Sequence, residues 1–216
     1  MKRFISIIMA ASMAFSLTAC GETKTTQTYA VNHTVGSKAD ATAEEVKDEN
    51  LLSGTYKVRI EVENYGDIVV ELDADSAPIS VTNFMNLVHE DFYSGLTFHR
   101  IIEGFMMQGG QSKEKKAKNI KGEFEGNGVN NPIRHERGVI SMARANDPNS
   151  ADSQFFICHQ DSFFLDGQYA AFGHVVSGMD VVDKICEEAI VTDNNGSVAP
   201  ENQPVIKGIY DITGEQ

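Results

Sequence analysis

The strongest constraint on the fold is a succession of short runs rich in branched and aromatic residues, which begins near residue 56 and is interrupted by glycine, asparagine and proline. Residues 57–62 and 67–72 alternate polar and apolar side chains, and Asn-Tyr-Gly at 64–66 between them predicts a β-hairpin. Similar runs predict further strands at residues 98–102, 105–108, 138–142, 154–158, 169–176 and 205–212. This part of the chain is therefore expected to be mainly β.

Two segments have helical periodicity instead. Pro78 suits the first turn of a helix, for which Asp75 or Ser76 could serve as the cap. Apolar residues then recur at helical spacing, at Val81, Phe84, Leu87 and Val88. A second helix is expected at residues 179–189. Because many strands accompany only two helices, without strand–helix–strand alternation, we expect a closed antiparallel β-barrel with two helices.

The N-terminal segment, residues 1–19, is a predicted secretory signal. Two basic residues precede an apolar run that is too short to cross a membrane as a helix. The sequence LTAC at 17–20 resembles the cleavage box of bacterial lipoproteins, and this resemblance implies a diacylglyceryl group on Cys20. The alternative is an ordinary signal peptide followed by a chance cysteine.

The rest of the chain divides into a polar segment and a folded domain. Residues 20–53 contain few large apolar side chains, which predicts a flexible linker, and the resemblance at LTAC implies that this linker is lipid-anchored. Residues 54–216 are expected to form the domain. The formal net charge is −13, and loss of residues 1–19, which hold two basic residues and no acidic one, would make it −15. A surface so acidic repels nucleic acid and anionic lipid, so we expect neither as a partner.

Cysteine and histidine placement gives no sign of a disulfide or metal centre. Cys158 follows an apolar run and Cys186 lies in the second predicted helix, which favours two buried free thiols over a disulfide. The six histidines lack metal-ligand spacing, and neither GxSxG nor HExxH occurs. We therefore expect no metal, no cofactor and no hydrolase chemistry.

Residues 98–110 read FHRIIEGFMMQGG and predict two strands joined by a tight turn. The guanidinium of Arg100 keeps its proton at any usable pH, so it is a fixed hydrogen-bond donor and not an acid or base. The alternative is an arginine on a solvated strand face beside core residues. Because side chains alternate along a strand, we expect Phe98, Arg100 and Ile102 to share one face of the first strand, with His99 on the opposite face. In the second strand, Met106 and Gln108 are expected to share a face.

Three segments share an unusual mixture of apolar and amide side chains. They are residues 98–110, residues 138–158 (GVISMARANDPNSADSQFFIC) and residues 163–173 (FFLDGQYAAFG). Together they closely resemble the cyclophilins, the cyclosporin-type peptidyl-prolyl cis–trans isomerases, and the resemblance extends from about residue 54 to the C-terminus. It implies an eight-stranded antiparallel barrel capped by a helix at each end, and a surface groove for Xaa-Pro peptides.

Residue by residue, the resemblance makes Arg100 the catalytic group. It implies a pocket for the proline ring lined by Phe105, Met106, Phe156 and Leu165. Contacts to the peptide backbone are implied for Gln108, Gln154 and an edge strand of Ala143, Arg144 and Ala145. Phe164 and Tyr169 complete the surface where many members have Trp and His, and Arg144 stands where many have Asn. The missing indole implies weak cyclosporin binding. Alternation separates Phe105 from Met106, so a bulge or strand twist must bring them together.

The implied reaction is rotation about a prolyl peptide bond, whose barrier is about 18–20 kcal/mol because the nitrogen lone pair is delocalised. A cationic donor near that nitrogen stabilises the twisted state more than either planar state. We expect a monomer, anchored outside the cytoplasm to the bacterial cell membrane, that acts on proline-containing peptides and unfolded exported proteins. The alternative function is a proline-peptide-binding or chaperone module with little turnover, which would have no need of Arg100.

Overall fold

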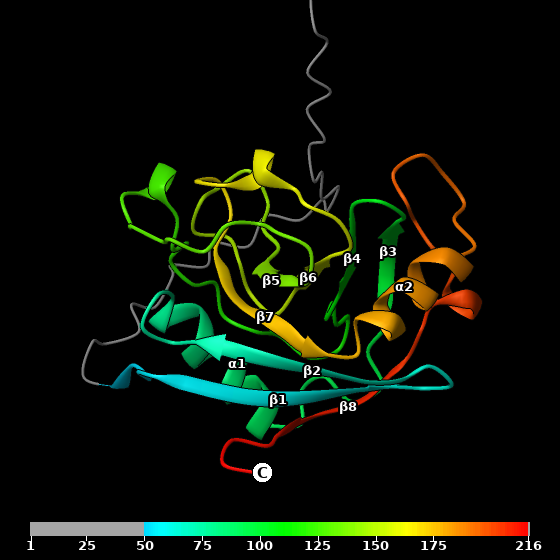
Figure 1. Cartoon of the computed structure of the whole chain (residues 1–216), viewed down its shortest axis with the longest axis horizontal. Helices are drawn as coiled ribbons and strands as arrows, with labels where there is room; N and C mark the ends of the chain where they lie inside the picture. The colour runs from blue at the N-terminus through cyan, green and yellow to red at the C-terminus, as the bar shows by residue number, and fades with distance from the viewer. Residues whose placement is uncertain (1–49, 216) are drawn as a thin grey trace, which may run out of the picture. The chain divides into compact units, whose positions relative to one another are not determined.

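The computed structural model describes residues 50–215, and within them eight strands form one antiparallel sheet (Figure 1). The strands are β1 (Thr55–Val62), β2 (Gly66–Asp73), β3 (Phe98–Ile102), β4 (Met106–Gly109), β5 (Val139–Met142), β6 (Phe155–Cys158), β7 (Ala171–Ser177) and β8 (Ile206–Asp211). Their spatial order is β3-β4-β6-β5-β7-β2-β1-β8. All the strands predicted from the sequence are present, with ends displaced by one or two residues.

The predicted hairpin is formed by β1 and β2. Their register runs from Thr55 opposite Asp73 to Val62 opposite Gly66, and Asn64 in the turn adopts the left-handed conformation with φ of 65°. Side chains alternate between a buried and a more exposed face along both strands. The buried face contributes to the main hydrophobic core, because alternate residues of a twisted strand share one side of the sheet.

The sheet is a curled half-barrel, and the prediction of a closed barrel is wrong. The edge strands β3 and β8 do not form a ladder of hydrogen bonds with each other. Only the residues just before them pair, at an isolated bridge between Thr97 and Val205. There the amide of Phe98 donates to the carbonyl of Pro204 at 3.0 Å. Pro204 has no N–H to return, so the pairing cannot extend into a regular ladder.

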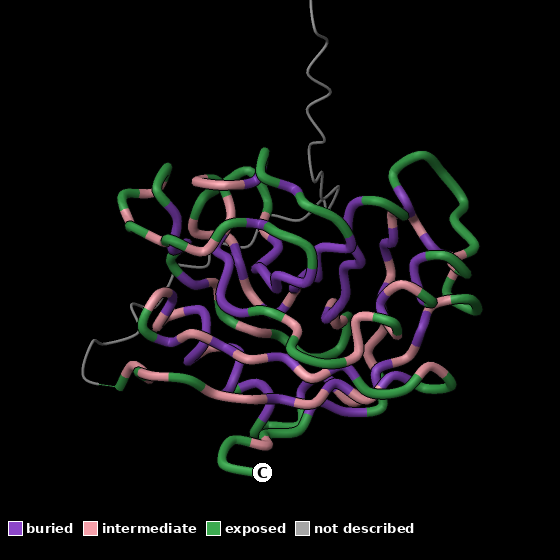
Figure 2. The backbone as a smooth tube through the Cα atoms, viewed as in Figure 1, coloured by how far each residue is buried: buried purple, intermediate pink, exposed green. Residues whose placement is uncertain are grey.

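Two α-helices pack on this sheet, as predicted: α1 (Pro78–His89) and α2 (Met179–Glu188). The ring centroid of Phe84 on α1 lies 5.5 Å from that of Phe155 on β6 and 5.3 Å from that of Phe172 on β7. Helix α1 therefore covers the main core. Figure 2 shows that β4, β5 and β6 run through the most buried part of the domain. Among residues 50–215, no helix is both long and apolar enough to traverse a bilayer.

The cap of α1 differs from the prediction. Neither Asp75 nor Ser76 caps the helix, because each is engaged elsewhere: Asp75 accepts from the amide of Gly54 at 2.8 Å, and the Ser76 hydroxyl donates to Asp73 at 2.6 Å. Instead Glu123, which is 2% exposed, reaches the helix from a distant loop. Its carboxylate oxygens accept hydrogen bonds from the amides of Ile79 and Ser80 at 2.9 and 2.7 Å and from the Ser80 hydroxyl at 2.7 Å.

Cys158 and Cys186 are buried free thiols, as predicted. Burial raises the pKa of each thiol to about 12. A thiol with so high a pKa holds almost no thiolate at neutral pH, so neither residue is suited to nucleophilic chemistry.

We predict that Glu123→Gln lowers the free energy of unfolding by about 1–3 kcal/mol, because a neutral amide replaces a carboxylate that binds the N-terminus of α1. Urea denaturation monitored by circular dichroism measures the change. Glu136→Gln, at an exposed position, is the matched control and should leave stability nearly unchanged. Equal stability of both variants would contradict the capping role.

Candidate active site

A β-bulge in β3 separates Arg100 from the main core. Phe98 pairs with Gly109 and Arg100 with Gln108, so His99 is an extra residue on β3. Consequently Phe98 lies in the main core, where its ring contacts Phe155 at 6.0 Å, while Arg100 lies on the other face beside Gln108. The prediction that Phe98 and Arg100 share a face is therefore wrong, because the bulge breaks the two-residue alternation.

The Arg100 side chain is buried, with 7% of its surface exposed. Its Nε donates to the carbonyl of Asn195 at 2.8 Å, and Nη2 lies 3.4 Å from Oδ1 of the same residue. Nη1 lies 3.4 Å from Oε1 of Gln108 and 3.6 Å from Sδ of Met106. Burial lowers the pKa of the guanidinium, and the nearby Tyr169 and Asp193 act in the opposite direction. The alternative of a solvated arginine is thus wrong.

Beside Arg100 lies a second, smaller apolar cluster, distinct from the main core. Its buried members are Phe105, Met106, Val139, Ala143, Phe156, Cys158, Leu165 and Ala171. Phe105 and Met106 share this cluster because Phe105 precedes β4 and belongs to the turn, where its amide donates to the carbonyl of Ile102 at 3.0 Å. A residue in a turn is not bound by strand alternation, so no bulge is needed here.

Two aromatic side chains flank this cluster. Phe164, which is 46% exposed, lies on a short 3-10 helix (Phe163–Leu165), and its ring centroid is 5.3 Å from that of Phe105. Tyr169 is half-buried and meets Phe156 edge to face at 5.9 Å. An exposed aromatic ring seated on an apolar cluster offers a partner surface to another apolar group.

Amide and backbone groups border the same cluster. Nε2 of Gln108 donates to Oε1 of Gln154 at 3.2 Å, which links β4 to the residue before β6. Ala143 follows β5, and its amide donates to the carbonyl of Gln154 at 2.9 Å. Ala145 is exposed, and its amide donates to the Ser150 hydroxyl within the same loop.

Arg144 lies across the ring of Tyr169, with Cζ 4.6 Å from the ring centroid, and donates from Nε and Nη2 to the carbonyl of Gln168 at 2.9 and 2.8 Å. It therefore braces Tyr169 against the cluster. The structure brings Arg100 together with the predicted residues of the apolar cluster and its border. Ala145 follows them in an exposed loop, and Cys20 lies outside the described residues.

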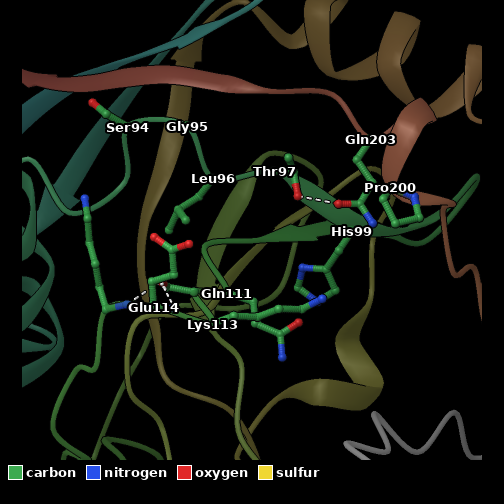
Figure 3. A pocket seen from close by; sticks show the side chains of 12 residues that line it. Ser94, Gly95, Leu96, Thr97, His99, Gln111, Lys113, Glu114, Pro200 and Gln203 are labelled. Carbon is green, nitrogen blue, oxygen red and sulfur yellow. Dashed lines mark hydrogen bonds between the residues drawn. The ribbon is translucent and has the colours of Figure 1, made fainter.

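The bulge directs His99 away from this region, as predicted. His99 borders a cleft of about 450 Å³ together with the Thr97 and Gln203 side chains, whose Oγ1 and Oε1 are 2.5 Å apart (Figure 3). Residues 111–115, which follow β4, also line this cleft. The cleft is thus separate from the Arg100 cluster.

Similarity to known proteins identifies the family. The family model for cyclophilin type peptidyl-prolyl cis-trans isomerases matches residues 57–210. The chain belongs to this family. It is 47% identical to peptidyl-prolyl cis-trans isomerase A of Dickeya dadantii over 141 residues, which cover 61% of this chain and 70% of the relative. It is 38% identical to peptidyl-prolyl cis-trans isomerase B of Escherichia coli over 156 residues, which cover 68% and 94%.

Solved cyclophilins agree with this assignment. A cyclophilin type isomerase of Cryptosporidium parvum, crystallised in the presence of the dipeptide Ala-Pro, superposes with a TM-score of 0.62 at 29% identity. The match covers 72% of this chain and 98% of that chain. The fold and the peptidyl-prolyl isomerase activity of this cyclophilin are thus those of its family.

Sequence reasoning missed a buried hydrogen-bonded chain beneath the cluster. The imidazole of His135 stacks on Phe156 at 6.0 Å, with Nδ1 3.0 Å from Asp166 Oδ1 and Nε2 3.0 Å from Ser141 Oγ. This order resembles a nucleophilic triad, but Ser141 is 0% exposed and out of reach of any substrate. These three hydrogen-bonded residues therefore support the ring of Phe156, on which His135 stacks. No sequence spacing could have revealed them, because they come from separate loops and strands.

We predict that His135 makes this cyclophilin less stable below about pH 6.5, because burial lowers the pKa of its imidazole from the usual value of 6.5. As the pH falls, the unfolded state takes up a proton that the folded state resists, so the free energy of unfolding decreases. Urea titrations between about pH 5 and 7.5 should show a steeper pH dependence for the wild type than for His135→Gln. A curve for His135→Gln that runs parallel to that of the wild type would contradict the prediction.

Proposed function

We propose that the buried guanidinium of Arg100 and the apolar cluster beside it form the catalytic site of the isomerase. The observation that carries the proposal is the placement of Arg100, which is 7% exposed and held by Gln108 and Asn195 at the border of the cluster that contains Phe105 and Phe156. A fixed cation next to a desolvated apolar surface suits the charge distribution of a twisted prolyl amide.

In the proposed mechanism the prolyl ring rests against Phe105, Met106, Phe156 and Leu165. When the peptide bond twists, conjugation is lost and the lone pair localises on the prolyl nitrogen, which then becomes a good hydrogen-bond acceptor. An N–H of Arg100 donates to that nitrogen in the twisted state and not in the planar states, which is the condition for acceleration. Each tenfold gain in rate requires about 1.4 kcal/mol of such differential binding.

The remaining site residues are proposed to hold the peptide backbone. Gln108 and Gln154 present their amide groups, and Ala143, Arg144 and Ala145 provide an edge for the acyl side of the substrate. Phe164 and Tyr169 are proposed to complete the surface, with weaker cyclosporin binding than in relatives that have Trp at the Phe164 position. The Ala-Pro dipeptide named for the Cryptosporidium parvum relative supports a substrate of this class.

We predict that Arg100→Ala folds normally and loses about 100-fold in activity on an Ala-Pro tetrapeptide, because the donor that stabilises the twisted amide is removed. The protease-coupled isomerisation assay measures the loss. Arg59→Ala, at a residue of β1 whose guanidinium packs on Tyr210, is the matched control and should retain wild-type activity. Turnover at the wild-type rate in Arg100→Ala would refute the mechanism. A wild-type protein that binds the peptide but does not isomerise it would favour a binding or chaperone module.

We further propose that this isomerase is a lipoprotein, anchored through Cys20 outside the cytoplasm, where it acts as a monomer on exported proteins before they fold. The support is the sequence alone: a basic start, an apolar run and LTAC at residues 17–20, followed by a polar linker. Two acyl chains on one cysteine would hold the domain stably at a membrane, because each buried methylene contributes about 0.8 kcal/mol.

We predict that the protein made in a bacterial host with an alkynyl palmitate label is labelled and sediments with membranes, whereas Cys20→Ser is unlabelled, because the thiol is the acceptor for the diacylglyceryl group. Cys186→Ser, which keeps Cys20, is the matched control and should be labelled. Proteinase treatment of spheroplasts should release the domain. Label on Cys20→Ser, or protection from the proteinase, would contradict the proposed anchoring.

A further inference from the structure

The loop that follows α2 returns to the outer edge of β3 and pairs with it opposite Arg100. Ser197 forms an isolated antiparallel bridge with Arg100, and the amide of Ile101 donates to the carbonyl of Gly196 at 2.8 Å. The amide of Val198 donates to the carbonyl of His99 at 3.0 Å. The edge strand that carries the guanidinium is therefore bounded by β4 on one side and by this loop on the other.

Within this loop Asn195 binds the guanidinium with two of its oxygens. The carbonyl oxygen accepts from Nε of Arg100 at 2.8 Å, and the side-chain Oδ1 lies 3.4 Å from Nη2. Gln108 and Met106 occupy Nη1 from the other side. A guanidinium has five N–H bonds. Among the described residues, each of these four contacts uses one N–H bond. The second N–H of Nη2 is therefore left for a substrate.

The loop is built to present Asn195 in this way. Oδ1 of Asp193 accepts from the amides of Asn195 and Ser197 at 2.9 and 3.0 Å, which closes a tight turn around the asparagine. Gly196 follows with φ of 80°, and a Cβ added there would lie 2.4 Å from the carbonyl oxygen of Ile101. Only glycine combines this conformation with so close an approach to β3.

We propose that Asn195 is a positioning residue for the isomerase reaction: it orients the guanidinium of Arg100 so that the remaining N–H of Nη2 points at the prolyl nitrogen. The inference rests on the proposed catalytic role of Arg100. Asn195 itself touches no substrate. Since it acts on the direction of a donor needed only in the twisted state, its loss affects turnover and leaves the affinity of the apolar cluster for the planar substrate unchanged.

The test compares Asn195→Ala with Asn194→Ala. Both residues are exposed, and Asn194 borders a separate cleft with Glu103 and Cys186. NMR exchange on an Ala-Pro tetrapeptide gives the rate of interconversion on the enzyme separately from Kd. We expect the rate to fall about three- to tenfold in Asn195→Ala, as for loss of one hydrogen bond of ordinary strength, with Kd changed by less than about twofold. Asn194→Ala should match the wild type.

A double-mutant cycle with Arg100→Lys shows whether Asn195 acts through Arg100. A lysine ammonium cannot occupy the two-point contact, so Asn195→Ala should have no further effect in that background. An equal additional loss there, or identical rates for Asn195→Ala and Asn194→Ala, would overturn the positioning role. If Arg100→Ala itself retained full activity, the proposed mechanism would fail, and that outcome is distinct from loss of the Asn195 effect alone.

Discussion

The proposed site depends on keeping one guanidinium charged inside the protein. Removing such a cation from water costs several kcal/mol unless its N–H groups find acceptors. Arg100 finds them in Gln108 and Met106 on β4 and in Asn195 on the loop after α2. These partners are a carbonyl, two amides and a thioether, all neutral. They accept from four of the five N–H bonds and carry no charge of their own, so the positive potential and the fifth N–H remain available to a substrate.

A single extra residue in β3 separates the packing role of this strand from its chemical role. The bulge at His99 sends Phe98 into the main core and leaves Arg100 and Ile102 beside the smaller cluster. His99 itself borders a cleft that Arg100 does not reach. The strand is thus anchored by Phe98 in the core, and this anchoring holds the neighbouring guanidinium in place. Bulges commonly redirect a side chain in this way next to functional sites.

Strand and helix positions were predictable because they depend on local patterns. The hairpin of β1 and β2, the later strands and both helices follow from alternation, helical spacing and turn residues. Closure of the barrel was predicted wrongly, because strand content does not reveal whether two edges pair; here Pro204 interrupts the pairing. The cap of α1 was also predicted wrongly, because Glu123 lies far from the helix in sequence and supplies its carboxylate through the tertiary fold.

By itself the sequence determined the family, the mainly β character and the set of candidate site residues, because motifs of this length and local periodicity are recorded in the order of the residues. Only the tertiary structure decided which side of β3 Arg100 occupies, how Phe105 joins Met106, and that Asn195 and His135 support the site from separate loops. These features arise from contacts between residues remote in sequence. Their geometry is set by packing and by the need to pair buried polar groups, and neither leaves a periodic signal along the chain.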